Sequence, residues 1–150
     1  MEFLVNNVDE TICIGKQIGQ LSNPGDIICL VGDLGTGKTH LTKGIAKGLN
    51  INDHITSPTF NIVNEYMGRL KFYHFDVYRV SDPDEIAAIG FDEYIFSQGV
   101  SVIEWANYID ELIPEEHIKI HIEKIDNSDS RKITINFSGK RYEYIKEIKL

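Results

Sequence analysis

One eight-residue stretch constrains this chain more than any other. Residues 32–39, Gly32-Asp33-Leu34-Gly35-Thr36-Gly37-Lys38-Thr39, fit the phosphate-binding pattern G-x-x-x-x-G-K-[ST]. The continuous apolar run at 27–31 precedes them and predicts a strand buried on both faces. Leu41, Ile45 and Leu49 follow at helical spacing, so the loop joins a strand to a helix. The sequence therefore predicts a P-loop that binds a nucleoside triphosphate.

The residue types of this loop suit phosphate chemistry. The glycines let the backbone approach phosphate oxygens with no Cβ in the way. Successive backbone N–H groups point at one concavity, and the helix N-terminus adds its positive dipole end. We expect Lys38 to lie against the β- and γ-phosphates, and the Thr39 hydroxyl to bind Mg²⁺.

Composition narrows the class of protein. A chain of 150 residues predicts a single domain, residues 1–150. The net charge of −8 argues against a protein that grips nucleic acid through its own surface. Cys13 and Cys29 stand apart, without metal-binding spacing, and are expected as core residues in a reducing compartment. No basic leader or apolar run of membrane length is present, which predicts a cytoplasmic protein with no membrane partner.

The remaining pattern predicts a mixed α/β fold. Asp82 is expected as a helix N-cap, with Pro83 at the first helical position and Glu85 closing a capping box. Apolar spacing predicts a helix over 9–21 and strands over 60–66, 70–77, 99–105, 118–122 and 133–137, with turns at 67–69 and 126–130. The expected fold is a P-loop NTPase-like mixed sheet with a parallel core, added antiparallel strands and flanking helices.

Two acids are candidates to complete the site. Mg²⁺ prefers oxygen ligands, and in this type of sheet they lie at the carboxyl ends of strands beside the phosphate loop. Glu104, directly after the apolar pair Val102-Ile103, fits as a metal ligand; the alternative is an ordinary acid at a strand end. Asp76 is expected to hold a water ligand of Mg²⁺ or to orient the attacking water, unless it is a structural partner of Arg79.

Two further features have modest weight. His74, in a strand, is expected as a core or hydrogen-bonded residue rather than a catalyst. The loop Thr56-Ser57-Pro58-Thr59-Phe60 has the hydroxyls and the stiff backbone of a segment that senses a γ-phosphate, although such clusters are commonly plain loops.

Four motifs together resemble the bacterial TsaE (YjeE) family, the ATPases of tRNA threonylcarbamoyladenosine biosynthesis. They are the phosphate loop, the segment 57–60, the run His74-Phe75-Asp76-Val77-Tyr78-Arg79, and Ile103-Glu104-Trp105-Ala106. They follow the family's order and spacing within residues 11–114. The resemblance implies an ATPase that works with the threonylcarbamoyl-transferase subunit and its paralogous partner (TsaD and TsaB type). That complex modifies the adenosine next to the anticodon in tRNAs reading codons that begin with A, and the chain would reach tRNA mainly through the complex.

The resemblance also assigns residues. It implies that residues 33–39 bind the phosphates of ATP, that Thr39 and Glu104 hold Mg²⁺, and that Asp76 is needed for hydrolysis. Trp105 would shape the nucleotide site, and Thr11 matches a position near the adenine. Residues 138–140 would close over the base. The sequence departs from the family at Ala106-Asn107, where many members have Pro and an acid, and the tail from Arg131 matches no motif.

The chain has only four arginines: Arg69, Arg79, Arg131 and Arg141. Efficient phosphoryl transfer usually places an Arg or Lys against the transition-state charge. We therefore expect Lys38, Asp76 and Glu104 to support only slow hydrolysis alone, with stimulation by partners.

Three alternatives compete with this interpretation, and for one of them, a GTPase, the nearest sequence match is a chance one. A small P-loop kinase would need an acceptor pocket and an Arg-bearing lid, which so few arginines disfavour. A GTPase would need an [NT]-K-x-D element, and the nearest match, residues 123–126, begins with Glu, which cannot donate the amide hydrogen bonds of Asn. A clamp that binds ATP without hydrolysing it is the third.

Overall fold

A seven-stranded mixed sheet organises the chain in the computed structural model, which describes residues 1–58 and 61–150. The strands are β1 (Glu2–Val5), β2 (Ile27–Val31), β3 (Val63–Met67), β4 (Lys71–Asp76), β5 (Val100–Glu104), β6 (Ile118–Lys124) and β7 (Arg131–Phe137). The α-helices are α1 (Val8–Leu21), α2 (Lys38–Gly48), α3 (Pro83–Ala88) and α4 (Phe91–Ile95), and the 3₁₀ segments are η1 (Ala106–Leu112) and η2 (Lys140–Glu147). None of these helices is long and apolar enough to cross a membrane.

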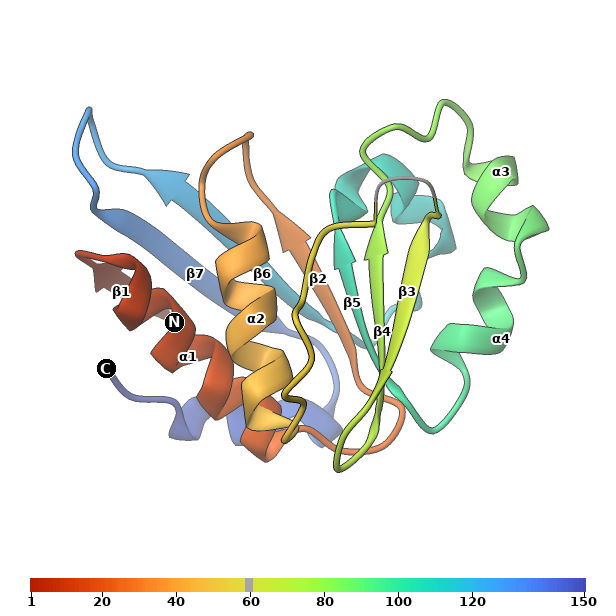
Figure 1. Ribbon diagram of the computed structural model, residues 1–150, viewed down its shortest axis with the longest axis horizontal. Helices are drawn as coiled ribbons and strands as arrows, with labels where there is room; N and C mark the ends of the chain where they lie inside the picture. The colour runs from red at the N-terminus through yellow and green to blue at the C-terminus, as the bar shows by residue number, and fades with distance from the viewer. Residues whose placement is uncertain (59–60) are drawn as a thin grey trace.

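The strand order is β1-β7-β6-β2-β5-β4-β3 (Figure 1). Strand β2 pairs in parallel with both β5 and β6, and β5 pairs in parallel with β4. Strand β3 is antiparallel to β4 at one edge, while β7 and β1 form antiparallel ladders at the other. The predicted parallel core with added antiparallel strands is confirmed.

Helices cover both faces of the sheet (Figure 1). On β2, Ile28 and Leu30 pack in the cluster with α1 and α2, whereas Ile27 and Cys29 pack in the cluster with α4 and η1. Strand β2 is thus buried on both faces, as its continuous apolar run predicts. Cys29 lies in this core, and burial raises the pKa of its thiol to about 12.

Some expectations were wrong. Cys13 is exposed, because it falls on the solvent side of α1. Strand β1 was not expected.

The Asp82 carboxylate caps α3 as predicted, because it accepts from the N–H of Asp84. Glu85 accepts from the Ser81 hydroxyl, so Glu85 does not close a capping box. Strand β3 begins at Val63, and the predicted start at Phe60 lies outside the described residues.

Helices α1 and α2 approach each other closely at glycines. A Cβ on Gly19 would lie 2.1 Å from the backbone oxygen of Ile45 and 2.9 Å from Cα of Gly48. One turn earlier, a Cβ on Gly15 would lie 3.0 Å from Cα of Gly44. The four glycines recur at four-residue spacing on both helices, so the two backbones pack directly together. This contact fixes α2, which carries the last residues of the phosphate loop at its N-terminus.

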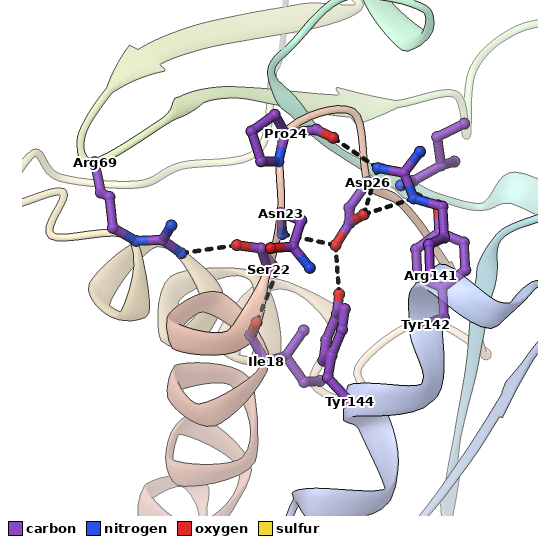
Figure 2. A network of polar contacts seen from close by, with 10 residues as sticks. Ile18, Ser22, Asn23, Pro24, Asp26, Arg69, Arg141, Tyr142 and Tyr144 are labelled. Carbon is purple, nitrogen blue, oxygen red and sulfur yellow. Dashed lines mark hydrogen bonds and ion pairs between the residues drawn. The ribbon is translucent and has the colours of Figure 1, made fainter.

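A polar network at the opposite end of the sheet fastens the C-terminal segment (Figure 2). The carboxylate of Asp26 is fully buried and accepts from Arg141, from the Tyr144 hydroxyl and from the N–H of Asn23. Burial and the Asp26 carboxylate raise the pKa of Tyr144. Arg69 donates to the carbonyl of Ser22 beside this network. A buried carboxylate needs such donors, and here they come from η2 and the α1–β2 loop.

We predict that Gly19→Ala lowers the unfolding free energy by about 3 kcal/mol or more, because the added methyl forces the two helix backbones apart. The gain in helix propensity, about 1 kcal/mol, offsets only part of this loss. Urea unfolding measures the change. Gln20→Ala on the exposed side of α1 is the matched control and should stay within about 0.5 kcal/mol of wild type. Equal stability of Gly19→Ala and wild type would contradict the close approach.

Candidate nucleotide-binding site

A pocket of about 640 Å³ opens where β2, β4 and β5 end. It brings together most of the predicted site residues: Thr11, the loop residues 34–39, Asp76, Glu104 and Trp105. Ser57 also lines it. The shared location follows from the parallel pairing, in which Leu30 of β2 lies opposite Glu104, and Glu104 lies opposite Asp76. Asp33 does not line this pocket.

The phosphate loop has the backbone that its glycines predict. Gly37 has a φ of 112°, and a Cβ built on it would meet nothing within 4 Å. This open space is the cradle that a bound phosphate requires. At the start of the loop, a Cβ on Gly32 would lie 2.5 Å from the carbonyl oxygen of Ile122, so only glycine fits there.

Lys38 is held inside the loop. Its ammonium donates to the carbonyls of Gly32 at 2.6 Å and Asp33 at 2.9 Å, and lies 4.1 Å from the ring centroid of Trp105. Burial lowers the pKa of Lys38, while the carboxylates of Glu104, Asp76 and Asp33 oppose that shift. The cation therefore has neighbouring acids and carbonyls as partners before any anion arrives.

Glu104 ends β5 and is 2 % exposed. Its Oε2 contacts Nε2 of His74 at 2.5 Å, and its Oε1 accepts from the Thr39 hydroxyl at 3.3 Å. The Thr39 hydroxyl also contacts that of Ser57 at 3.1 Å. His74 is fully buried and hydrogen-bonded, in line with its sequence prediction, and it holds one oxygen of Glu104 while the other faces Thr39. Thr59 and Phe60 of the same loop lie outside the described residues.

Asp76 ends β4 beside Glu104. Its Oδ1 accepts from the N–H of Tyr78 at 3.0 Å. Burial raises the pKa of the Asp76 carboxyl, the Tyr78 N–H lowers it, and the Glu104 carboxylate raises it further. Within residues 1–58 and 61–150 no ion pair joins Asp76 to Arg79, which is exposed. The structural pairing considered from sequence is therefore absent from this part of the chain.

Trp105 lines the pocket, and the rings of two tyrosines pack against it. Its ring centroid is 4.6 Å from that of Tyr78 and 5.5 Å from that of Tyr108. Trp105 has a φ of 64°, an uncommon backbone conformation for a bulky side chain, and it follows Glu104 directly. The turn at Trp105 redirects the chain from β5 into η1 and places the indole beside Lys38.

Sequence reasoning missed one wall of the pocket. Asp129 and Arg131, from the β6–β7 hairpin, line it together with Asn6 and Asn7 before and at the start of α1. The expectation that residues 138–140 close over the base was wrong. Strand β7 runs antiparallel to β6, and Ser138 bonds to His117 at the opposite end of the sheet. The pairing of Lys124 with Arg131 shows that the start of β7 faces the loop.

A phosphate loop between a buried strand and a helix, with acids on the neighbouring parallel strands, is the arrangement of the P-loop NTPase-like fold. Comparison with known proteins gives the family. Residues 5–133 match the family of the threonylcarbamoyl adenosine biosynthesis protein TsaE. This chain belongs to the TsaE family, as the four sequence motifs indicate.

Relatives and a solved structure agree. The chain is 46% identical to the tRNA threonylcarbamoyladenosine biosynthesis protein TsaE of Bacillus subtilis, with 94% of this chain and 88% of the relative covered. It is 36% identical to the protein of the same name from Treponema pallidum, with 90% and 99% covered. The crystal structure of Bacillus subtilis YdiB superimposes with a TM-score of 0.82 at 41% identity, over 98% of this chain and 91% of that one.

We predict that Asp76→Asn stabilises the nucleotide-free protein at pH 7. Because burial raises the pKa of Asp76 above its ordinary 3.8, the charged carboxylate opposes folding at neutral pH, and this cost disappears as the pH falls below that value. Asn keeps the acceptor for the Tyr78 N–H and removes the charge. We expect a rise in Tm of roughly 1–3 °C at pH 7 and less near pH 4, by calorimetry.

Asp53→Asn is the control for this prediction, because Asp53 is exposed. It should leave Tm nearly unchanged at both pH values. A fall in Tm for Asp76→Asn at pH 7 would show instead that the Asp76 charge has a stabilising structural partner.

Proposed function

We propose that this chain, as one P-loop domain over residues 1–150, is a Mg²⁺-dependent ATP hydrolase. It would serve threonylcarbamoylation of the adenosine next to the anticodon in tRNAs reading codons that begin with A. In the reaction, water attacks the γ-phosphorus, the bond to the β–γ bridging oxygen breaks, and ADP and inorganic phosphate leave. The observation that carries the proposal is the convergence of Lys38, Thr39, Asp76 and Glu104 on one pocket.

The donor set fits Mg²⁺. Thr39 and Glu104 present a hydroxyl and a carboxylate oxygen 3.3 Å apart, and both line the pocket. Mg²⁺ usually takes one or two protein oxygens together with phosphate oxygens and water, so two ligands suffice. The described residues contain no cluster of three or more His, Cys, Asp or Glu, which is consistent with a metal held jointly with the nucleotide. Bound Mg²⁺ would neutralise charge on the phosphates.

The residues have separate tasks in this proposal. Lys38 exchanges its carbonyl partners for phosphate oxygens when ATP enters. The Gly37 N–H and its neighbours in the loop hold the phosphates. Asp76, with a pKa raised by burial, orients the attacking water. His74 fixes the orientation of Glu104 from the protein interior.

Slow hydrolysis by the isolated chain is part of the proposal. Three of the four arginines already have partners: Arg69 donates to carbonyls at the C-terminal end of α1, Arg141 pairs with Asp26, and Arg131 donates to the phosphate loop. Arg79 is exposed and has no side-chain hydrogen bond to the described residues. An arginine or lysine supplied in trans raises such rates by roughly 10³–10⁵.

The partners follow from the family and from charge. The TsaE family takes its name from threonylcarbamoyl adenosine biosynthesis, which involves other Tsa proteins. We assign the stimulating role to the threonylcarbamoyl-transferase subunit and its paralogue (TsaD and TsaB type) in the cytoplasm. The net charge of −8 supports contact with tRNA mainly through that complex rather than through this chain.

Phosphate release tests the proposal directly. We predict little ATP hydrolysis by the chain alone, and an increase of at least ten-fold when the TsaD- and TsaB-type subunits are added with tRNA. Lys38→Ala is the blank and should abolish the stimulated rate, and omitting Mg²⁺ should do the same. Equal turnover with and without partners would contradict partner stimulation, and phosphate transfer to a small-molecule acceptor would favour a kinase.

We also predict that His74→Leu raises the Mg²⁺ concentration that half-saturates ATP hydrolysis. Without His74 the buried Glu104 loses the partner of its Oε2, so its carboxylate is poorly oriented, a change that typically costs about 10- to 100-fold in metal affinity. The readout is the Mg²⁺ concentration that half-saturates ATP hydrolysis. The control is His121→Leu on the exposed face of β6, which should not shift this midpoint. An unchanged midpoint in His74→Leu would remove His74 from the site.

A further inference from the structure

The β6–β7 hairpin packs against the tip of the phosphate loop through one arginine. Nε of Arg131 donates to the carbonyl oxygen of Thr36 at 3.1 Å, and a terminal nitrogen lies 3.5 Å from that of Gly35. On the same side, a Cβ on Gly35 would lie 3.4 Å from the ammonium of Lys124. The side chain of Arg131 therefore contacts the loop at two consecutive peptide groups.

These contacts with Arg131 fix the direction of one backbone N–H that can donate a hydrogen bond to a phosphate. In a planar trans peptide the C=O and the following N–H point in opposite directions. With the Thr36 carbonyl turned toward Arg131, the N–H of Gly37 points away from the hairpin, and Gly37 lines the pocket. The N–H of Thr36 bonds instead to the carbonyl of Asp33. Among the described residues the Gly37 N–H has no acceptor of its own.

Arg131 is itself held rigidly. As the first residue of β7, it pairs with Val5 of β1 on one side and Lys124 of β6 on the other. Its second terminal nitrogen donates to the carbonyls of Ser128 and Ser130 within the hairpin. Because both its backbone and its guanidinium are held in this way, Arg131 can hold the loop tip with little loss of side-chain entropy when a nucleotide binds.

Arg131 also contributes positive charge to the lining of the pocket. Lys38 and Arg131 are the lysine and arginine side chains that line the described pocket, against three carboxylates from Asp76, Glu104 and Asp129. A polyphosphate entering this acidic setting gains from each nearby cation.

We propose that Arg131 is a positioning residue for the nucleotide: by holding the carbonyls of Gly35 and Thr36 outward, it keeps the Gly37 N–H aimed at the phosphates. This inference rests on the proposed nucleotide function. It assigns to the β6–β7 hairpin a role in phosphate affinity, although Arg131 makes no phosphate contact of its own in this arrangement.

Nucleotide affinity in matched variants tests this role. Dissociation constants for ATP, ADP and adenosine are measured by calorimetry with Mg²⁺ for wild type, Arg131→Ala, Arg131→Lys and Lys132→Ala. Lys132 is the adjacent control, since its exposed side chain pairs with Glu2 on the far side of the strand ladder. We expect Arg131→Ala to bind ATP and ADP roughly ten-fold more weakly, with adenosine unchanged. Arg131→Lys should recover only part of this loss, because an ammonium cannot span two carbonyls as the guanidinium does.

A steady-state measurement separates positioning from general damage. With the partner subunits present, Arg131→Ala should raise KM for ATP and leave kcat within about two-fold, since the acids at β4 and β5 are untouched. Equal ATP affinity of Arg131→Ala and wild type, or full recovery of ATP affinity in Arg131→Lys, would overturn the positioning role. Either result would leave the proposed function standing. Failure of wild type to bind ATP would overturn the proposed function, and this inference with it. If Arg131→Ala does not fold, Arg131→Lys decides, and affinity equal to wild type contradicts the inference.

Discussion

The parallel pairing of three neighbouring strands is the constraint on which the site depends. Strand β2 delivers the phosphate loop, and β4 and β5 deliver Asp76 and Glu104, all at the carboxyl ends. If one of these strands ran in the opposite direction, its terminal residue would lie at the far end of the sheet. The continuous apolar sequence of β2 and the full burial of β5 support this arrangement, because parallel strands are usually covered on both faces. The burial of these strands therefore permits the parallel pairing that brings the phosphate loop, Asp76 and Glu104 to the same end of the sheet.

The site brings three charged side chains, Lys38, Asp76 and Glu104, close together in a partly buried place. Glu104 is almost fully buried, and its oxygens are satisfied by His74 behind it and Thr39 in front. Asp76 accepts one backbone hydrogen bond, from the N–H of Tyr78, and burial raises the pKa of its carboxyl. Lys38 supplies the opposing charge and is itself retained by loop carbonyls. In the proposed function, this balance of charges suits an anionic nucleotide that enters together with Mg²⁺. The close glycine contact between α1 and α2 holds in place the helix that carries the end of the phosphate loop.

Much of this was predictable from sequence because local signals coincide with the global fold. The apolar runs located β2 and β5, and the acid after Ile103 identified Glu104. Features that depend on distant pairing were not predictable. Arg131 reaches the phosphate loop only because β7 lies antiparallel to β6, two strands away from β2, and no local pattern encodes that distance. The location of residues 138–140 was mispredicted for the same reason, whereas Cys13 was mispredicted because it lies on the solvent side of α1. The glycine spacing in α1 and α2 was visible, but its meaning required knowing that the two helices touch.

A crystal structure with Mg²⁺ and a non-hydrolysable ATP analogue tests the central claim most directly. The account predicts triphosphate in the pocket between the phosphate loop and the ends of β4 and β5. The ammonium of Lys38 should have left the carbonyls of Gly32 and Asp33 for phosphate oxygens, and Thr39 and Glu104 should face the metal. A nucleotide bound elsewhere, or bound here with Lys38 still on those carbonyls and Glu104 away from the metal, would contradict the account.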